Sequence, residues 1–285
     1  ITCRDWSSDV CSSDLKGISM EILNKTQAPF GQDVWTTIES ELGNYLAKRL
    51  NLRSVVDFND SYGFSTDAIN TGNLKKVSSK HGTTVSTREP IKMVEIKHSF
   101  SVSKELIEDL KRGKVDFDNS TFTATANNFA KVENDMILNG LKDANIGGMI
   151  SKETQTLSAT SPKDIMVSVA KAMGMFNSSF VDGPFTLVIS STTMAKLMTE
   201  SFDGKSIKSR IDDILGKGSI IINNDIGDDK ALVISQRGGD FEYYSGLDVC
   251  VGYEGETKDN VELFLLQTCS FRTITPEALI VINIK

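Results

Sequence analysis

Hydrophobic residues recur at helical spacing in several segments of the first half of the chain. The spacing predicts a helix that begins at Val34, with Asp33 as its N-cap, and a strand over residues 91–102. It also predicts a short helix over residues 104–112, between a Ser103 cap and Gly113, and a long helix over residues 120–142. Glu133 interrupts the apolar stripe of the long helix, and a solvated edge is the usual explanation of such a break.

In the second half, short apolar runs alternate with helical patterns. Ser161 followed by Pro162 predicts the start of a helix, because the serine can cap it and proline suits the first helical position. The further predicted elements are strands over residues 185–189, 219–222 and 231–235, helices over residues 192–200 and 207–215, and tail strands over residues 241–244, 247–253, 261–273 and 279–284. This alternation predicts a compact α/β unit of about 80 residues followed by a β-rich tail.

Residues 62–89 are rich in Gly, Ser, Thr, Asn and Lys and contain few large apolar residues. Such a stretch cannot bury a core face of its own. It is either disordered or a long two-stranded arm that gains stability by lying on another subunit. The whole pattern predicts one domain built from both ends of the chain, an inserted α/β domain and one long arm.

The first nineteen residues contain a serine-aspartate near-repeat around Cys11 and lack the apolar core of a secretory signal. We interpret residues 1–19 as a non-native leader of translated adapter sequence, with Met20 as the start of the native protein. Cys3 and Cys11 belong to this segment. Cys250 and Cys269 remain, in strand-like runs without CxxC spacing, and we expect buried thiols of a protein in a reducing cytosol.

Composition and charge narrow the class of partner. The chain has 285 residues, of which 39% are hydrophobic and 24% charged, and its net charge is −7. An acidic balance argues against general nucleic-acid binding, which needs a basic face. No stretch reaches the roughly 20 apolar residues of a membrane span. We therefore expect neither a nucleic acid nor a membrane as partner.

Catalytic and metal-binding motifs are scarce in the sequence. His81 and His98 are the only histidines, so a histidine-rich metal site is excluded, and there is no GxSxG, Walker A, HExxH or GxGxxG motif. The glycines of residues 216–219 predict a turn into a strand rather than a phosphate loop. The acidic run at residues 223–229 predicts a solvated hairpin turn rather than a cation loop. We expect no enzyme activity, no cofactor and no metal.

Several segments carry, in order, a resemblance to one known family. They are Ala28-Pro29, Arg88-Glu89-Pro90, residues 183–189 (GPFTLVI), residues 226–234 with their ALVIS ending, residues 237–241 (RGGDF), residues 251–254 (VGYE) and residues 275–280 (TPEALI). In this combination the chain resembles the encapsulins, the linocin-like shell proteins, in register from Met20 to Lys285.

The resemblance implies an α+β fold of the HK97 capsid type. Its peripheral domain would comprise residues 20–62, with the N-terminal helix, residues 95–147 and the C-terminal strands of residues 239–285. Its extended loop, the E-loop, would be residues 63–94, and its axial domain residues 148–238. Encapsulins form closed icosahedral shells in the cytoplasm, and a chain of this length implies about sixty copies.

The resemblance also implies a partner and a place to bind it. Encapsulin cargo, such as a ferritin-like iron-storage protein or a dye-decolourising peroxidase, is captured through a C-terminal targeting peptide. The corresponding pocket residues are Leu46, Arg53, Val55, Asp57 and Tyr243. Leucine and valine would form an apolar floor, and the charged pair would orient the peptide backbone. The alternative is that Leu46 and Val55 are ordinary core residues.

A second implied site is the loop at the tip of the axial domain, where five copies would surround a fivefold axis. It consists of Glu200, Ser201, Phe202, Asp203, Gly204, Lys205 and Ser206. If Asp203 lines the channel, a ring of about five carboxylates would concentrate small cations, and an inward Lys205 would offset it. The alternative is a flexible turn with no gating role.

Some encapsulins bind a flavin through a tryptophan, but this chain has Val85 at that position, and no flavin is expected. The same fold occurs in phage or prophage major capsid proteins, which remain an alternative. A bacteriocin-like or protease-like enzyme is disfavoured, because histidine is scarce and no nucleophile motif is present.

Overall fold

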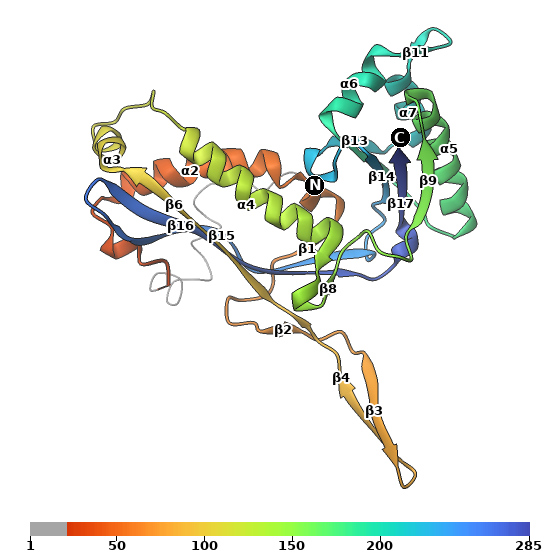
Figure 1. The fold of residues 1–285 in the computed structure, drawn as a ribbon, viewed down its shortest axis with the longest axis horizontal. Coiled ribbons are helices and arrows are strands. Elements are labelled where there is room, and N and C mark those ends of the chain that lie inside the picture. Colours follow the sequence, from red (N-terminus) through yellow and green to blue (C-terminus); the bar gives the residue numbers. More distant parts are fainter. Residues whose placement is uncertain (1–21) are drawn as a thin grey trace. The chain divides into compact units, whose positions relative to one another are not determined.

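The computed structural model describes residues 22–285, and the chain divides into two compact units (Figure 1). Unit 1 comprises residues 22–50, 59–132 and 244–270 among those described, and unit 2 comprises residues 51–58, 133–243 and 271–285. The expected leader, residues 1–19, lies outside the described residues. Within residues 22–285, no helix is both long and apolar enough to cross a membrane.

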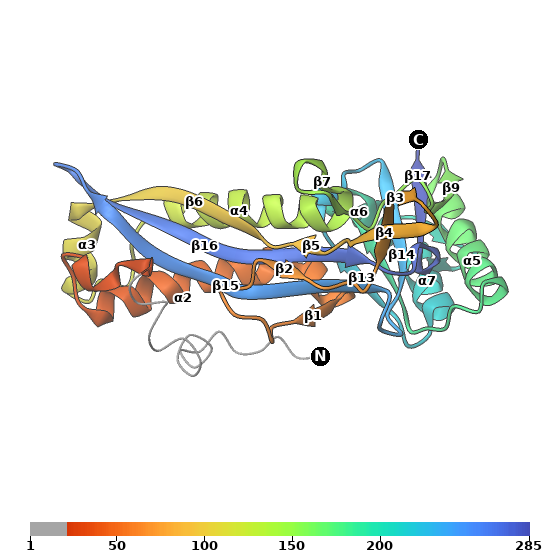
Figure 2. The same cartoon turned by 90° about the horizontal axis from the view of Figure 1, so that it is seen from below.

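A four-stranded sheet has the order β1 (Asp57–Asn59), β15 (Phe241–Glu256), β16 (Asn260–Thr273) and β6 (Val94–Ser103). Strands β16 and β6 are antiparallel, from the pair Asn260 and Ser103 to the pair Cys269 and Val94. In unit 1, α2 (Gln32–Arg49), α3 (Lys104–Lys111) and the first part of α4 (Ser120–Asn139) pack on these strands, and Figure 2 shows α2 and α4 running alongside them. Their shared core includes Ile38, Leu42, Phe122, Phe129, Phe100, Val251 and Leu263.

Helix α2 begins earlier than the sequence predicts. Its N-cap is Gly31, and the N–H of Trp35 already bonds to the Gly31 carbonyl at 3.4 Å. The prediction of Asp33 as the cap is therefore wrong, because Asp33 lies within the first turn, where its carboxylate suits the helix dipole. The short 3-10 helix η1 (Lys25–Gln27) precedes α2. The predicted Ser103 cap of α3 is confirmed by the bond from the Leu106 N–H to its hydroxyl at 3.2 Å.

Helix α4 ends at Asn139, three residues before the predicted end at 142. Gly140 has φ 76°, and a Cβ there would lie 2.4 Å from the Ile146 carbonyl oxygen. The chain turns back at this glycine through β7 (Gly140–Leu141), η3 (Lys142–Ala144) and β8 (Ile146–Gly147), and β7 pairs with β8. The helical pattern in the sequence continued past a position that only glycine can occupy.

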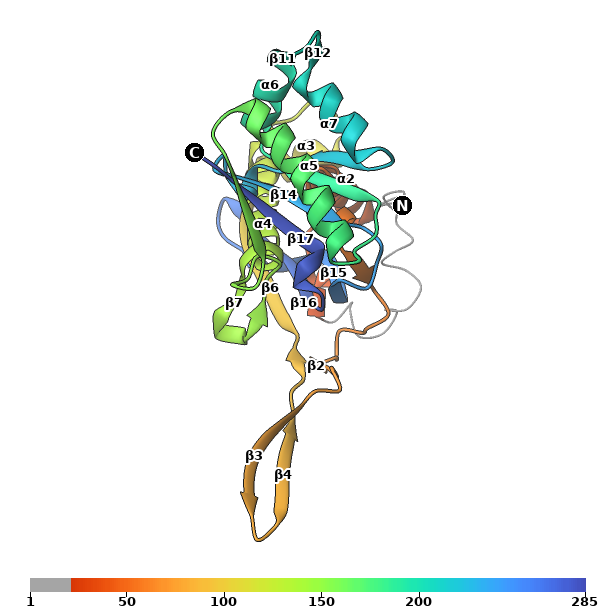
Figure 3. The ribbon, with the colours of Figure 1, turned by 90° about the vertical axis from the view of Figure 1, so that its right-hand side faces the viewer.

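Residues 63–94 form a two-stranded ribbon that extends away from the sheet of unit 1 (Figure 3). Strand β2 (Ala68–Ile69) pairs with β5 (Ile91–Lys92) at its base, and β3 (Leu74–Lys80) pairs antiparallel with β4 (Thr83–Arg88). His81 and Gly82 have φ values of 52° and 76°, so a two-residue turn of the hairpin type closes the tip. Of the two alternatives, the structure has a two-stranded arm, and its contact with another subunit stays a prediction.

The tail and arm strands differ in extent from their predictions. Residues 91–102 are two strands, because Met93 separates β5 from β6 and bonds instead to the Asp67 carbonyl. Conversely, residues 241–256 form one continuous strand where two were predicted. Gly246 lies in the middle of it, and a Cβ there would lie 2.7 Å from the Thr268 hydroxyl. Residues 245 and 246, which separate the two predicted strands, are therefore packed within the sheet. Cys250 and Cys269 are buried thiols, as predicted.

Unit 2 is built on a mixed five-stranded sheet. Its order is β13 (Ser219–Ile222), β10 (Phe185–Ile189), β14 (Lys230–Ser235), β17 (Leu279–Ile284) and β9 (Gln155–Ala159). Helix α5 (Pro162–Ser178) packs on β9 and β17, and α6 (Ser191–Thr199) and α7 (Ile207–Leu215) pack on each other and on α5. Ser161 caps α5, as predicted, through a bond from the Asp164 N–H at 3.2 Å.

Strand β17 lies between β14 and β9, following the 3-10 helix η5 (Pro276–Ala278). The resemblance implies that this segment belongs to the peripheral domain, whereas its hydrogen bonds are with the sheet of unit 2. The division into peripheral and axial domains stays a prediction.

The acidic run at residues 223–229 is not a hairpin turn. It contains η4 (Asn224–Ile226) and joins β13 to β14, but β10 lies between these two strands. The segment is therefore a crossover, and Asn223 and Ile226 are buried in it. Within residues 22–285, no group of three or more His, Cys, Asp or Glu side chains could hold a metal ion. The glycine turn before β13 leads into that strand, as predicted.

Candidate functional site

The loop between α6 and α7 is a small hairpin. Strand β11 (Ser201–Phe202) pairs antiparallel with β12 (Lys205–Ser206), and Asp203 and Gly204 join them with φ values of 52° and 78°. Two positive φ values are typical of a type I′ turn, for which Asp-Gly is a preferred sequence. Ser206 then caps α7 by accepting a bond from the Ser209 N–H at 3.2 Å.

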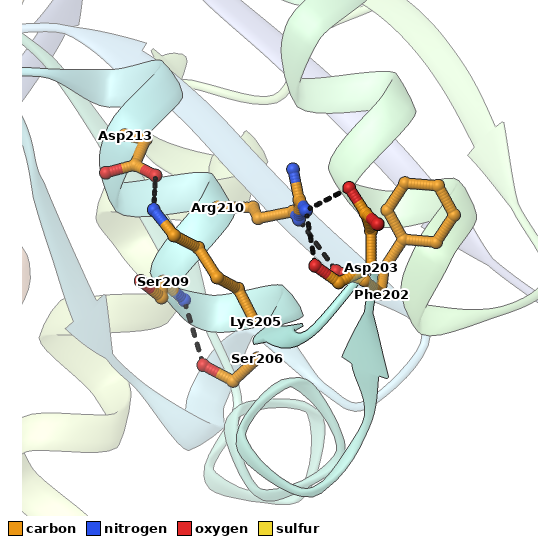
Figure 4. Close-up of polar contacts among 7 residues, drawn as sticks. All are labelled: Phe202, Asp203, Lys205, Ser206, Ser209, Arg210 and Asp213. Atoms are coloured by element: carbon orange, nitrogen blue, oxygen red, sulfur yellow. Dashed lines mark hydrogen bonds and ion pairs between the residues drawn. The ribbon is translucent and has the colours of Figure 1, made fainter.

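Arg210, on the first turns of α7, holds the hairpin closed (Figure 4). Its Nε donates to the Phe202 carbonyl at 2.8 Å, and its Nη2 donates to the Asp203 carbonyl and carboxylate, each at 3.1 Å. Arg210 was not among the predicted site residues. The available signal was a cation four residues after the Ser206 cap, where a side chain can reach back to the loop.

The Phe202 ring lies between two cations. The Lys163 ammonium nitrogen is 4.3 Å from the ring centroid, and the Arg210 guanidinium carbon is 5.3 Å from it. Lys163 comes from the start of α5 and Arg210 from α7, so the ring ties two helices to the hairpin. Contacts of this kind contribute about 0.5–1 kcal/mol each at exposed sites.

Both charges that the sequence analysis considered for a pore have an opposite partner. Asp203 is paired with Arg210 at 3.1 Å, and Lys205 with Asp213 at 3.3 Å. The negative side chains of the loop and its supports are Glu200, Asp203 and Asp213, and the positive ones are Lys163, Lys205 and Arg210. The formal charges cancel, so one copy of the loop presents side chains of both signs and no strongly negative surface.

The predicted cargo residue Arg53 lies in the 3-10 helix η2 (Asn51–Val55) and forms a bidentate pair with Glu133. Nε donates to Oε1 at 2.6 Å and Nη2 donates to Oε2 at 2.7 Å. The side chain of Glu133 is 0% exposed and that of Arg53 14%. The expectation of a solvated edge at Glu133 is therefore wrong: the guanidinium replaces water as its partner.

Aromatic rings flank the same guanidinium. Phe58 stacks on Tyr243 with ring centroids 5.3 Å apart, and the Arg53 guanidinium carbon is 5.1 Å from the Phe58 centroid and 5.5 Å from that of Tyr243. Tyr243 is buried, whereas Phe58 is partly exposed. Phe58 was not among the predicted site residues, and a lone aromatic in a polar run carries no signal by itself, because single exposed apolar side chains are common.

Asp57 is exposed and contacts the turn of residues 237–240. Its Oδ2 accepts a bond from the Gly239 N–H at 2.6 Å. In that turn, Arg237 donates to Asp240 through Nε at 2.9 Å and Nη2 at 2.8 Å. These hydrogen bonds raise the pKa of the Arg237 guanidinium above its ordinary value. The RGGD motif thus works as a cross-linked turn that Asp57 fastens to β1.

The structure distributes the predicted cargo-pocket residues unevenly. Leu46 belongs to unit 1, and the other residues of the set, Arg53, Val55, Asp57 and Tyr243, belong to unit 2. Leu46, Val55 and Tyr243 are buried, so in the isolated chain they pack the interior rather than form an open floor. Asp57 is the exposed member of the predicted set, and the unpredicted Phe58 beside it is also exposed. The five-residue pocket stays a prediction.

A family model described as "Encapsulating protein for peroxidase", Linocin_M18, matches residues 20–270. The type 1 encapsulin shell protein of Brevibacterium linens is 31% identical over 262 residues, which cover 91% of this chain and 98% of that protein. The shell protein of the same name from Mycobacterium tuberculosis is 30% identical over 267 residues, covering 93% of this chain and all of its own length. These relatives are named as shell proteins, which supports a structural rather than an enzymatic role.

Solved structures agree on the fold. A virus-like particle protein from Pyrococcus furiosus superposes with a TM-score of 0.65 at 20% identity, covering 87% of this chain and 99% of its own. The capsid protein of Myoviridae phage XM1 superposes with a TM-score of 0.58 at 11% identity, covering 83% and 92%. At such low identity the likeness carries the fold alone, and it confirms the predicted α+β fold of the HK97 capsid type. Together with the family model and the relatives named as shell proteins, it shows that this chain belongs to the type 1 encapsulin shell proteins.

Proposed function

We propose that this chain assembles with about sixty copies of itself into a closed cytoplasmic shell that encloses a cargo protein. Membership of a shell-protein family supports assembly into a particle. The copy number, the compartment and the cargo are the parts that we propose here. The observation that carries the proposal is the arm of residues 63–94.

The arm buries too little surface to account for its own order. Every residue of β4 is exposed, and Leu74, Val77 and Val85 present apolar side chains to solvent. Its two strands pair with each other, so each also has an outer edge that can accept another strand. Fixing a two-stranded ribbon costs conformational entropy that a lone hairpin rarely recovers. A neighbouring subunit would supply the missing contacts.

We propose a peroxidase as the cargo class, because the matching family is described as encapsulating one; the resemblance adds a ferritin-like iron-storage protein as the second class. The cargo would carry a C-terminal targeting peptide. Strand β1 supports a docking place for it, because β1 is an edge strand whose residues are all exposed. An extended peptide can add to such an edge, with Phe58 as an apolar contact and Asp57 as a polar one.

The experiment is co-expression of the chain with a dye-decolourising peroxidase that carries or lacks a shell protein's targeting tail. Particles are separated by size-exclusion chromatography, their mass is measured by light scattering, and the peroxidase that co-elutes is quantified. Phe58→Ser tests the docking place, and Val115→Ser, at another exposed apolar residue, is the matched control. We expect loading that requires the tail, is lost in Phe58→Ser and is kept in Val115→Ser.

The outcomes separate the parts of the proposal. A chain that elutes as a monomer or dimer contradicts the shell function. Particles that exclude tailed peroxidase but load a tailed ferritin-like protein contradict the first cargo class. Loaded Phe58→Ser particles place the docking site elsewhere.

We also propose that the Asp203-Gly204 hairpin borders a channel at a symmetry axis. Because the hairpin's charges cancel, removing one sign at a time should change cation entry in opposite directions. Asp203→Asn should slow the initial uptake of ferrous iron into particles loaded with a ferritin-like cargo, and Lys205→Gln should speed it. Both effects should shrink as salt rises toward about 0.15 M, where the screening length is about 8 Å. Equal rates for the wild type and both variants would remove this hairpin as the entrance.

A further inference from the structure

The turn that follows α5 presents one large apolar side chain to solvent. Phe180 is 88% exposed, although the neighbouring Phe176 and Val181 are buried. Nothing in the sites described above uses this residue. A single exposed apolar side chain is common on protein surfaces, so exposure alone has no functional meaning. The backbone conformation of Phe180, in contrast, indicates a function.

Phe180 occupies the position where most helices of this type end with glycine. Its φ is 55°, its N–H bonds to the Asn177 carbonyl at 3.2 Å, and the N–H of Val181 bonds to the Phe176 carbonyl at 2.9 Å. This pair of bonds, with the apolar contact expected between Phe176 and Val181, is a Schellman motif. A bulky side chain at positive φ is unfavourable, and such outliers cluster at functional positions.

The backbone from Phe180 to Pro184 is held in place by residues 235–237 of one neighbouring segment. The bonds run from Arg237 Nη1 to the Phe180 carbonyl at 3.1 Å, from the Ser235 hydroxyl to the Asp182 carbonyl at 2.5 Å, and from the Gln236 N–H to the Pro184 carbonyl at 2.8 Å. Arg237 is itself fixed by its bidentate pair with Asp240. The turn is therefore braced while the ring that it carries has little protein around it.

We propose that Phe180 is a preformed subunit-contact anchor, whose ring is buried against a second copy of this chain in the assembled particle. The inference rests on the proposed assembly. Membership of a shell-protein family supports association of this chain with copies of itself, so a second copy is the occupant to which the proposal commits. Aromatic anchors are enriched at the centres of interfaces, and a backbone fixed in advance reduces the entropy lost on binding. This gain in binding explains why a phenylalanine occupies a position where glycine would relieve the backbone strain.

The first test measures the ring directly in the wild-type protein. Cargo-free particles are exposed to a short pulse of hydroxyl radicals, and the oxidation of each phenylalanine is read by mass spectrometry. Phe122, which is 0% exposed, marks full protection, and a phenylalanine-containing peptide added to the sample marks full exposure. We expect Phe180 to be oxidised as little as Phe122. Oxidation near the level of the added peptide overturns the anchor, as does protection that develops only when cargo is loaded.

The second test removes the Phe180 ring and keeps the left-handed backbone of the turn. Phe180→Gly and Phe180→Asn remove the ring but suit the left-handed backbone, so the helix end is retained. We expect these variants to fold, as judged by circular dichroism, and their particles to dissociate at lower guanidinium concentration than the wild type. Val115→Asn, at a residue that is 90% exposed, should leave dissociation unchanged. Variants at Phe180 that dissociate like the wild type, or a Val115 variant that is weakened equally, overturn the anchor.

The proposed function fails separately from the anchor. If the wild-type chain forms no particle by light scattering, the shell function and the anchor fail together. If particles form and Phe180 is nevertheless oxidised freely, the anchor alone is wrong.

Discussion

The arm of unit 1 and the five-stranded sheet of unit 2 are both β-structure, but they are stabilised in different ways. In the sheet, the central strands β10, β14 and β17 are buried along most of their length, and α5 packs on β9 and β17. In the arm, β3 and β4 pair only with each other within the described sheets, and β4 is exposed throughout. Backbone pairing is common to both. Burial of apolar side chains is not.

This difference indicates that the sheet is stabilised when the single chain folds, whereas the arm is stabilised when subunits assemble. The sheet of unit 2 contains within one chain the apolar contacts that stabilise it. The arm has a sequence that favours a ribbon, with a His-Gly turn at its tip, but lacks a surface on which to lie. A subunit of this design would fold its sheets first and complete its arm only against other subunits.

Removing the ribbon should abolish the particle and leave the rest of the chain folded. The variant replaces residues 73–89 with a two-glycine turn and keeps β2 paired with β5. We expect a species of low mass in light scattering, with the circular dichroism of a folded chain. Particles of wild-type mass would contradict the role assigned to the arm.

Glu133→Ala should strongly destabilise the chain whether or not it is assembled. The substitution leaves the Arg53 guanidinium largely buried without its carboxylate partner, and breaking a buried pair in this way costs about 3–5 kcal/mol. The measurement is the midpoint of guanidinium unfolding followed by circular dichroism. The double variant Arg53→Met, Glu133→Leu is the control, because replacing both charges by apolar groups is often neutral. A double variant as unstable as Glu133→Ala would contradict this interpretation.

The same substitution made in each region should have different effects. Leu232 in β14 is 0% exposed and Leu74 in β3 is 68% exposed. Leu232→Ala should lower the free energy of unfolding by about 2–5 kcal/mol, because it leaves a cavity. Leu74→Ala should leave the unfolding of unassembled chains unchanged and lower the stability of particles. Equal effects on unassembled chains would show that the arm is already packed within its own subunit.

The smallest effect concerns the carboxylate of Asp164 in the first turn of α5, whose hydrogen-bond partners all lie within the same chain. Hydrogen bonds from Thr160 and Ser161 hold the pKa of Asp164 below its ordinary value. A lowered pKa means that the carboxylate stabilises the folded chain at neutral pH and that this contribution is lost as pH falls through the folded-state pKa. Below about pH 4, the ordinary range of an aspartate pKa, stability should therefore fall more steeply in the wild type than in Asp164→Asn. Parallel pH profiles would show that ionisation of the Asp164 carboxyl contributes nothing to stability.

Elements with strong local signals were predicted to the residue. Residues 185–189, 207–215, 219–222 and 279–284 coincide with β10, α7, β13 and β17. The arm could be predicted as a choice between two states, because its composition excludes a core face but does not supply a partner. The pairing partners of strands, such as β17 between β14 and β9, depend on contacts distant in sequence and had no local signal.

The errors arise where tertiary contacts override a local pattern. Glu133 breaks an apolar stripe and was predicted to be solvated, but a guanidinium 80 positions earlier in the chain allows it to be buried. Arg210 was not predicted although its spacing from the Ser206 cap was a signal, whereas the contacts of Phe58 with Arg53 and Tyr243 depend on geometry that spacing does not encode. Phe180 was also not predicted, because the feature that distinguishes it is a left-handed backbone conformation that usually requires glycine, and a phenylalanine in the sequence does not indicate it.

The most direct test of the account is hydrogen exchange of the arm in the wild-type particle and in dissociated subunits. Amides of residues 74–88 should exchange slowly in intact particles, including those on the outer edges of β3 and β4. They should exchange rapidly once subunits separate, while amides of β14 and β17 stay protected in both states. Arm amides that exchange at the same rate in the two states would contradict the claim that a second copy completes the arm.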